Sequence, residues 1–129
     1  MPQPFEIALQ DGGIVYMRLI GSLDSTNFEI LKSQVESAKK LVKEESERVG
    51  HKLNILFDIS EFTGTYNVGA MLAMKGLEEH NRPYSNKTAV YGGSAAAQVA
   101  AELTLELIGR DTLKLFKSKE DALAWLKEG

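Results

Sequence analysis

Hydrophobic and polar residues alternate at the start of the chain. Phe5, Ile7 and Leu9 are separated by polar or small residues, which is the pattern of a half-buried β-strand. Residues 14–21 alternate in the same way, and Asp-Gly-Gly at residues 11–13 separates the two stretches. Glycine tolerates the positive φ angles of tight turns, so these residues predict a β-hairpin.

A helical period replaces the alternation after this hairpin. Thr26 and Glu29 have the spacing of a capping box, in which two side chains satisfy the first free amides of a helix. Apolar residues then recur at helical spacing along one stripe, at Phe28, Leu31, Val35, Ala38 and Val42. Gly50 is placed to end this helix.

Strands and helices alternate along the rest of the chain. Residues 53–60 are almost continuously apolar, as in a central strand that is covered on both faces. A Gly/Thr/Tyr/Asn-containing turn is expected next, over Thr63–Val68. The remaining pattern predicts helices at 67–80, 94–109 and 119–129, and strands at 87–93 and 112–118.

Two of these helices have apolar stripes that we expect to face the core. The stripe of the helix at 67–80 consists of Val68, Met71, Leu72 and Leu77. That of the alanine-rich helix at 94–109 consists of Val99, Leu103 and Leu107.

The order of elements predicts an α/β fold. Alternating strands and helices after an opening hairpin indicate a mixed, mostly parallel sheet of about five strands, covered by about four helices. The sequence has no internal repeat, linker or low-complexity segment. We therefore expect a single domain over residues 1–129.

Composition excludes several kinds of chemistry. The 129 residues include no cysteine, which excludes a disulfide scaffold, a thiolate metal site and a cysteine nucleophile. A formal net charge of −3 provides no basic field for nucleic acid. The first ten residues lack the features of a signal peptide, and no apolar run is long enough to cross a bilayer. A cytoplasmic protein is the expectation.

The polar residues do not form a known catalytic or metal-binding pattern. Asp58 and Ser60 follow the central strand, but His51 and His80 stand apart from each other and from other metal-ligand types. The nucleophile-elbow motif Gly-x-Ser-x-Gly is missing. We expect no catalytic residue, metal or cofactor, and a hydrolase built on Asp58 and Ser60 is the minority alternative.

A small group of adaptable side chains suggests an apolar pocket. Methionine fills irregular spaces easily, and Met71 and Met74 follow shortly after Tyr66. The alternative is that Met71 packs on the sheet and Met74 covers the edge of a helix. Under the first interpretation, these three residues would contact a lipid-like ligand.

Several short motifs, taken in order, resemble those of the STAS superfamily, the domain of sulphate transporters and anti-sigma-factor antagonists. Gly21–Asp24 resembles the Gly-x-Leu-Asp of that superfamily, Asp58–Ser60 its Asp-Leu-Ser, and Ala122–Leu126 its closing helix. The resemblance extends from about residue 5 to residue 127 and is greatest for the SpoIIAA-like branch.

This resemblance implies a regulatory protein that works by contact with a partner protein. In anti-sigma-factor antagonists, a kinase phosphorylates a serine at the start of the second helix, and Asn67 stands at that position here. Asn67 cannot take a phosphate, although the hydroxyls of Thr63 and Thr65 are nearby. The expected partner surface comprises Ser60, Thr63, Gly64, Thr65, Tyr66, Asn67, Val68 and Gly69.

Two alternatives remain open at this point. The SpoIIAA-like branch has been associated with membranes or lipids, so the resemblance also implies a lipid-like ligand with peripheral membrane association. The opening hairpin would leave an edge strand free, through which the chain could form a homodimer.

Overall fold

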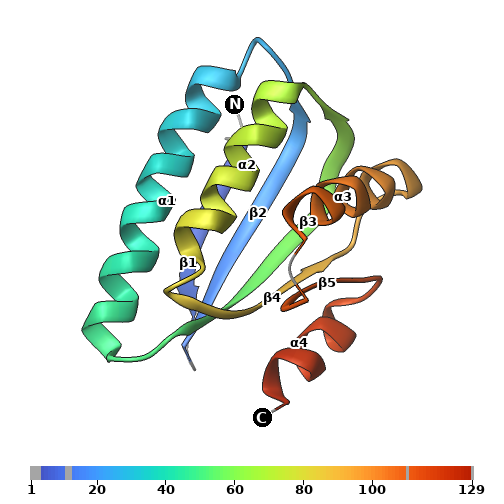
Figure 1. The fold of residues 1–129 in the computed structure, drawn as a ribbon. Helices are drawn as coiled ribbons and strands as arrows, with labels where there is room; N and C mark the ends of the chain where they lie inside the picture. The colour runs from blue at the N-terminus through green and yellow to red at the C-terminus, as the bar shows by residue number, and fades with distance from the viewer. Residues whose placement is uncertain (1–3, 11–12, 110, 129) are drawn as a thin grey trace.

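A computed structural model describes residues 4–10, 13–109 and 111–128 of the chain. Figure 1 shows one sheet with helices packed on it. In the described residues the strands are β1 (Phe5–Gln10), β2 (Ile14–Leu23), β3 (Leu53–Tyr66), β4 (Ser85–Tyr91) and β5 (Leu113–Phe116). The helices are α1 (Phe28–Val49), α2 (Val68–Asn81), α3 (Ala95–Ile108) and α4 (Lys119–Lys127).

The five strands lie in the order in which they occur in the sequence, β1-β2-β3-β4-β5. Strands β1 and β2 are antiparallel, and every later pair is parallel. The predicted α/β fold with a mixed, mostly parallel sheet is therefore confirmed. The predicted turn at residues 11–13 falls partly outside the described residues, but Gly13 has a φ of 75°, in the left-handed region.

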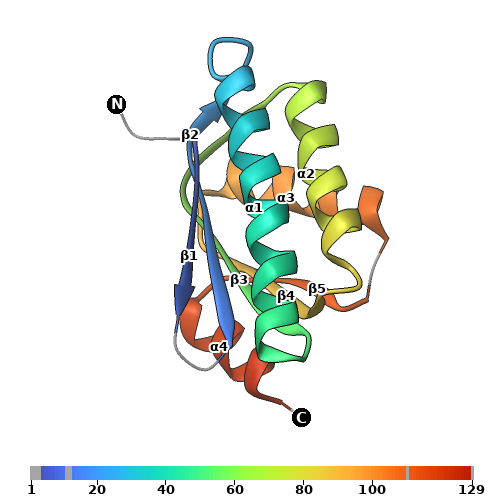
Figure 2. The same ribbon diagram turned by 90° about the vertical axis from the view of Figure 1, so that its left-hand side faces the viewer.

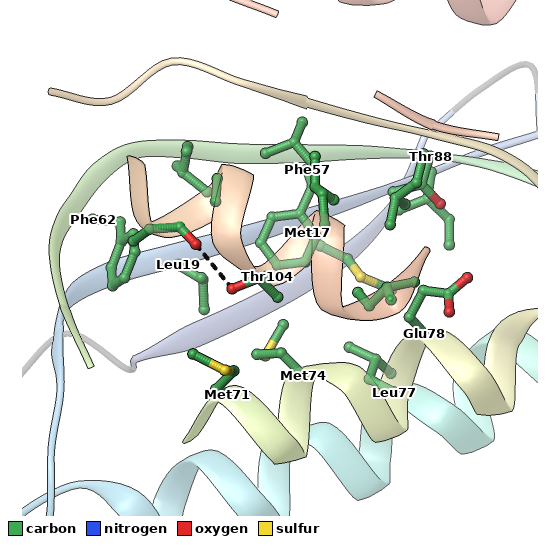
Figure 3. Close-up of a pocket in the computed structure, with 18 of the residues that line it drawn as sticks. Met17, Leu19, Phe57, Phe62, Met71, Met74, Leu77, Glu78, Thr88 and Thr104 are labelled. Atoms are coloured by element: carbon green, nitrogen blue, oxygen red, sulfur yellow. Dashed lines mark hydrogen bonds between the residues drawn. The ribbon is translucent and has the colours of Figure 1, made fainter. Parts of the chain in front are cut away.

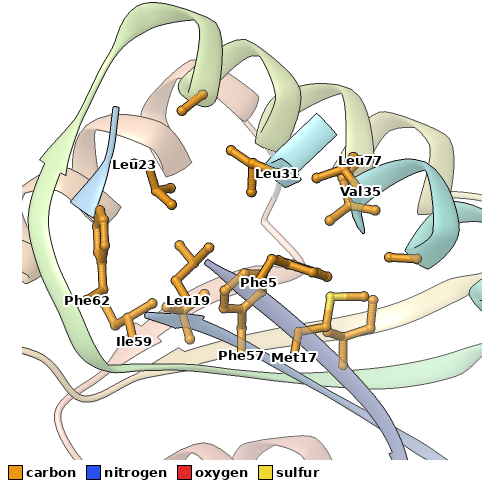
Figure 4. Close-up of a cluster of buried hydrophobic side chains, with 14 of the residues drawn as sticks. Phe5, Met17, Leu19, Leu23, Leu31, Val35, Phe57, Ile59, Phe62 and Leu77 are labelled. Carbon is orange, nitrogen blue, oxygen red and sulfur yellow. The ribbon is translucent and has the colours of Figure 1, made fainter. Parts of the chain in front are cut away.

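Alternation along the strands gives the sheet two buried faces. Val15 and Met17 of β2 point to the face covered by α1, α2 and α3, whereas Tyr16 lies on the face covered by α4. The two views agree that α1 and α2 lie side by side, with α4 on the opposite side of the sheet (Figures 1 and 2). Figure 4 shows the larger core, where Phe5 and Phe57 meet edge to face at 6.1 Å.

Helix α1 follows its predicted stripe but not its predicted cap. Leu31, Val35, Ala38 and Val42 are buried, and Gly50 ends the helix in the left-handed conformation. The capping box is wrong, because Asn27 is the N-cap residue and forms no side-chain cap bond.

The side chain of Asn27 is used elsewhere. Its Nδ2 donates to the carbonyl of Ser22 at 2.7 Å, and its Oδ1 accepts from the amide of Asp24 at 3.1 Å. These bonds use both polar atoms of the Asn27 side chain within the connection between β2 and α1.

The apolar stripes predicted for α2 and α3 are partly wrong. Leu77 is buried, but Val68 and Leu72 are 70% and 56% exposed. All three stripe residues of α3 are 44–56% exposed, namely Val99, Leu103 and Leu107. Helix α3 instead buries Ala97 and Ala100, because their small side chains allow close packing against β3.

None of the helices in the described part of the chain combines the length and the apolar character that a bilayer crossing requires.

Candidate functional site

The carboxyl end of β3 forms an irregular strand rather than the expected turn. Arg18 pairs with Asp58 and Ile20 with Glu61, so β3 uses one more residue than β2 over the same step. A second irregularity follows, and β3 continues to Tyr66 before α2 begins. The prediction of a turn over Thr63–Val68 is therefore wrong. Bulges of this kind re-aim the side chains at the end of a strand.

The Asp58 side chain forms hydrogen bonds on both sides of the first irregularity. This residue is only 7% exposed, and its Oδ1 accepts from the amide of Ser60 at 2.8 Å and from the Ser60 hydroxyl at 2.5 Å. Its Oδ2 accepts from the hydroxyl of Tyr16 at 2.5 Å. The Asp58 side chain thus accepts a hydrogen bond from the backbone amide of Ser60, which lies at the bulge where the regular pairing between β2 and β3 is interrupted.

The ionisation of this cluster follows from burial and from these bonds. Burial by itself would raise the pKa of Asp58, but the bonds from the Ser60 and Tyr16 hydroxyls outweigh it and leave the pKa below its ordinary value. Burial, together with the nearby carboxylate, raises the pKa of Tyr16 and of Tyr91. At neutral pH the carboxyl is charged and both phenols are protonated, so neither kind of group is poised to exchange a proton.

The second irregularity joins β3 to its neighbours. The hydroxyl of Thr63 lies 2.9 Å from that of Ser22, donates to the carbonyl of Gly21 at 3.3 Å and accepts from the amide of Thr65 at 3.2 Å. Gly64 has a φ of 91°, and a Cβ placed on it would lie 2.7 Å from the carbonyl carbon of Ala96. The backbone of α3 therefore packs directly on the end of β3.

Asn67 begins α2 as a side-chain cap. Its Oδ1 accepts from the amide of Ala70 at 2.7 Å, which satisfies one of the free amides of the first turn. The neighbouring Gly69 lies against Phe28 of α1, since a Cβ placed there would be 3.1 Å from the ring. The start of α2 is thus held by a cap on one side and by α1 on the other.

The residues expected to contact a partner lie along this corner, which we define as residues 60–69. Its side chains differ in exposure. Ser60, Thr63, Thr65 and Val68 are exposed, and Gly64, Tyr66, Asn67 and Gly69 are half-buried. The corner therefore presents mainly hydroxyls and one aliphatic side chain, with Glu61 as its charged member.

A cavity of about 100 Å³ lies between α2, α3 and the sheet, beside the corner (Figure 3). All three residues predicted to contact an apolar ligand, Tyr66, Met71 and Met74, line it. The Tyr66 hydroxyl donates to the carbonyl of Ala100 at 3.2 Å and lies 3.4 Å from the hydroxyl of Thr104. Tyr66 thus belongs both to the corner and to the wall of the cavity.

Sequence reasoning allowed for the third helix beside the pocket but did not name the α3 residues that line the cavity. These residues are Ala100, Ala101, Thr104, Leu105 and Ile108. Helix α3 is apolar on more than one face, so its period alone did not distinguish the buried face from the exposed one. The clustering of its alanines was the signal that could have identified the buried face.

Both histidine rings lie within hydrogen-bond distance of a neighbouring oxygen atom. The Nδ1 of His51 lies 2.9 Å from the carbonyl of Lys52, and that of His80 lies 3.0 Å from the side-chain oxygen of Asn81. Within residues 4–10, 13–109 and 111–128, no three His, Asp or Glu side chains gather closely enough to hold a metal ion.

Comparison with known proteins identifies relatives of the whole fold. The model of the SpoIIAA-like family matches residues 14–127. An uncharacterised protein from Shewanella loihica with a SpoIIAA-like fold is 20% identical, with a TM-score of 0.61 over 95% of this chain and 93% of its own. No sequence among the curated proteins matches the chain.

Two further solved structures share the fold. Bacillus SpoIIAA in its phosphorylated form, a cell fate determinant, is 15% identical, with a TM-score of 0.58 over 95% of this chain and 99% of its own. SLC26A9 is also 15% identical, with a TM-score of 0.64 over 89% of this chain, which spans only 20% of that protein. At these identities the likeness is one of fold, and it agrees with the resemblance in the sequence motifs.

Proposed function

The chain belongs to the SpoIIAA-like family, and on that premise we propose that it is a non-enzymatic regulatory module that binds a partner protein through its corner. The observation that carries the proposal is the exposure of Val68 and Leu72, one helical turn apart, beside the cap at Asn67. Contiguous exposed apolar side chains mark surfaces that bind proteins, and charged residues are depleted at the centre of such surfaces.

Several contacts restrain the corner in the absence of a partner. The Thr63 hydroxyl bonds, the packing of Gly64 on α3 and the cap at Asn67 all restrain it. A surface that is already ordered loses less conformational entropy on binding, which favours affinity. This supports docking at the corner without a prior folding step.

Asn67 makes this docking constitutive in our proposal. A phosphate beside a helix N-terminus would interact with the amides there and reshape the partner surface. An asparagine side chain cannot be phosphorylated, and it keeps the cap permanently in place. The partner would therefore be a regulatory protein whose binding is not controlled by phosphorylation at this position.

Charge and apolar variants test the corner. Asn67→Asp keeps the cap but adds a negative charge, so it should weaken a partner complex by about tenfold or more while the fold stays intact. Val68→Ser should have a similar effect, and Leu103→Ser on α3 is the matched control, because Leu103 is also an exposed aliphatic residue. Affinity would be measured by titration with a partner identified by crosslinking in the host.

One outcome would show that the partner does not bind at the corner. If Leu103→Ser weakens the complex while Asn67→Asp and Val68→Ser leave the affinity unchanged, the partner binds elsewhere.

The cavity supports a second candidate function, the binding of an apolar ligand. Its lining is almost entirely apolar, and α2 provides two flexible methionines. Ligand sites are commonly apolar cavities with a few polar groups. In this function the chain would carry a lipid-like molecule, with peripheral membrane contact as its route of loading.

Filling the cavity tests this second function. Ala101→Leu would place a larger side chain into the cavity, whereas Ala124→Leu adds the same atoms at an exposed position on α4. Native mass spectrometry of protein purified from its host should find a bound small molecule in the wild type and in Ala124→Leu, but not in Ala101→Leu. A wild-type protein with no added mass argues against this function.

A further inference from the structure

We infer that the outer face of α3 binds a basic amphipathic helix of a partner protein. We define this outer face by Val99, Glu102, Leu103, Glu106 and Leu107. It lies on a different element from the corner, so the inference assigns a second docking surface. The docking proposed at the corner does not depend on it.

Three large apolar side chains form a row along the outer face. Val99, Leu103 and Leu107 follow one another at a spacing of four residues, and they are 56%, 54% and 44% exposed. Residues at this spacing lie one above the other on a helix. Helix α3 packs on α2, β3 and β5 and buries Ala97 and Ala100, so its apolar row is left in contact with water. A contiguous row of this kind marks a surface that binds another molecule.

Two acidic side chains flank the apolar row. Glu102 and Glu106 are exposed, and neither carboxylate pairs with a basic side chain among the described residues. Like charges four residues apart destabilise a helix. Glu106 also lies in the last turn, where the helix dipole favours a cation, and this turn contains no basic residue. A partner with positive charge would relieve both unfavourable interactions.

The neighbouring helices do not share this arrangement of charges. Lys39 pairs with Glu36 at 3.0 Å in α1, and Lys75 pairs with Glu79 at 3.4 Å in α2. In these helices a cation three or four residues away balances the glutamate on the same surface. The outer face of α3 has no such cation, because residues 95–108 contain neither Lys nor Arg.

The same charges argue against two other occupants of the outer face. An anionic bilayer would repel Glu102 and Glu106, and helices that lie on membranes carry Lys or Arg on their polar face. A second copy of α3, packed in the antiparallel direction, would place the two rows of glutamates side by side. The repulsion between these like charges disfavours such a dimer.

A basic amphipathic helix satisfies both features of the outer face. Its apolar residues would pack against the row of Val99, Leu103 and Leu107, because rows at this spacing fit between those of another helix. Lys or Arg side chains beside its apolar stripe would lie opposite Glu102 and Glu106. Burial of the apolar row would supply affinity, and the charges would supply specificity and a faster association rate.

Two designed peptides of equal length test this choice of partner. Both carry leucine at the helical positions i, i+3, i+4 and i+7, and the remaining positions are lysine in one peptide and glutamate in the other. Fluorescence anisotropy of the labelled peptides would measure their binding to the whole chain. The lysine peptide should bind about tenfold or more tightly than the glutamate peptide, and added salt should reduce this difference.

Three variants of the protein locate the binding on the outer face. Leu103→Ser should weaken binding of the lysine peptide about tenfold. Val68→Ser changes an exposed aliphatic residue of the corner and should leave this affinity unchanged. The double variant Glu102→Lys/Glu106→Lys should prefer the glutamate peptide. All four side chains are exposed, so circular dichroism should show an unchanged fold.

Three outcomes would overturn the inference. The first is a Glu102→Lys/Glu106→Lys protein that still prefers the lysine peptide, and the second is a Leu103→Ser protein that binds this peptide as tightly as the wild type. The third is binding of phosphatidylglycerol vesicles by the wild type but not by Leu103→Ser, because a bilayer would then cover the outer face. Docking at the corner is judged separately, by the effects of Asn67→Asp and Val68→Ser on its own partner.

Discussion

At the scale of single residues, Asn67 has a structural role in addition to the regulatory role that we propose for it. Its side chain caps α2, and the same side chain cannot accept a phosphate. Asn67→Ala should lower the free energy of unfolding by about 1 kcal/mol, because the amide of Ala70 loses its partner. Urea denaturation would measure this. Asn67→Ser retains a cap and should stay within a few tenths of a kcal/mol of the wild type.

Asp58 gives the protein a defined response to acid. Its pKa is lower in the folded chain than in the unfolded chain, so its contribution is present at neutral pH and is lost as the pH falls below about 4, through the folded pKa. Urea denaturation at a series of acidic pH values should show this loss. The decline should be shallower in Asp58→Asn, whose side chain does not titrate.

A variant of Tyr16, which donates a hydrogen bond to Asp58, provides the control for the loss of stability in acid. Tyr16→Phe removes one bond to the carboxylate, so the folded pKa of Asp58 should rise toward its ordinary value and the acid-dependent loss should shrink. An Asp58→Asn protein with the same acid profile as the wild type would assign the response to other carboxylates.

At the scale of elements, two glycines provide opposite tests of the packing of β3 and α2. Gly64→Ala should destabilise the fold by about 2 kcal/mol or more, because its φ is positive and the new Cβ would overlap the backbone of α3. Gly76→Ala, inside α2, meets only the distant Nζ of Lys39 and should stabilise by about 0.5–1 kcal/mol. Thermal unfolding of the two variants would show the opposite signs.

The elements themselves were largely predictable from the sequence, because hydrophobic period and end signals report local structure. Ser94 and Gly109 were expected to bound α3, and they do so as cap residues. The buried face of α3 was not predictable from its period, since Leu103 and its neighbours compete with the alanines for the core. The close approach of β3, which is a tertiary contact, selects the face with the small alanine side chains, and the clustering of alanines was the sequence signal for that face.

The candidate site was predictable in part. Tyr66, Met71 and Met74 were grouped from their spacing and side-chain flexibility, and they line one cavity. The rest of the lining was not predictable, because Thr88 of β4 and Thr104 of α3 come from different elements that only the folded sheet brings together. The irregular end of β3 was mistaken for a turn, because glycine and threonine are common in both turns and bulges.

At the scale of the whole molecule, the two sides of the sheet have different roles. Helix α4 covers one side with a small, closed core around Leu56, Ala89 and Ala122. Helices α2 and α3 cover the other side and leave the cavity between them. Leu126→Ala in α4 should cost about 2–5 kcal/mol in unfolding free energy and should leave the binding of an apolar ligand in the cavity unchanged. Chemical denaturation and native mass spectrometry would measure the two effects separately.

The position of Tyr66 has a consequence for how the two proposed functions relate. Tyr66 is the last residue of β3, which forms most of the corner. Its hydroxyl forms hydrogen bonds with α3 at the wall of the cavity. Under our proposals, a ligand that displaces this hydroxyl alters the surface of the corner, and thermodynamic reciprocity then requires that partner binding change the affinity for the ligand by the same factor. Tyr66→Phe removes these hydrogen bonds but keeps the ring. In this variant, ligand binding and partner binding should no longer affect each other.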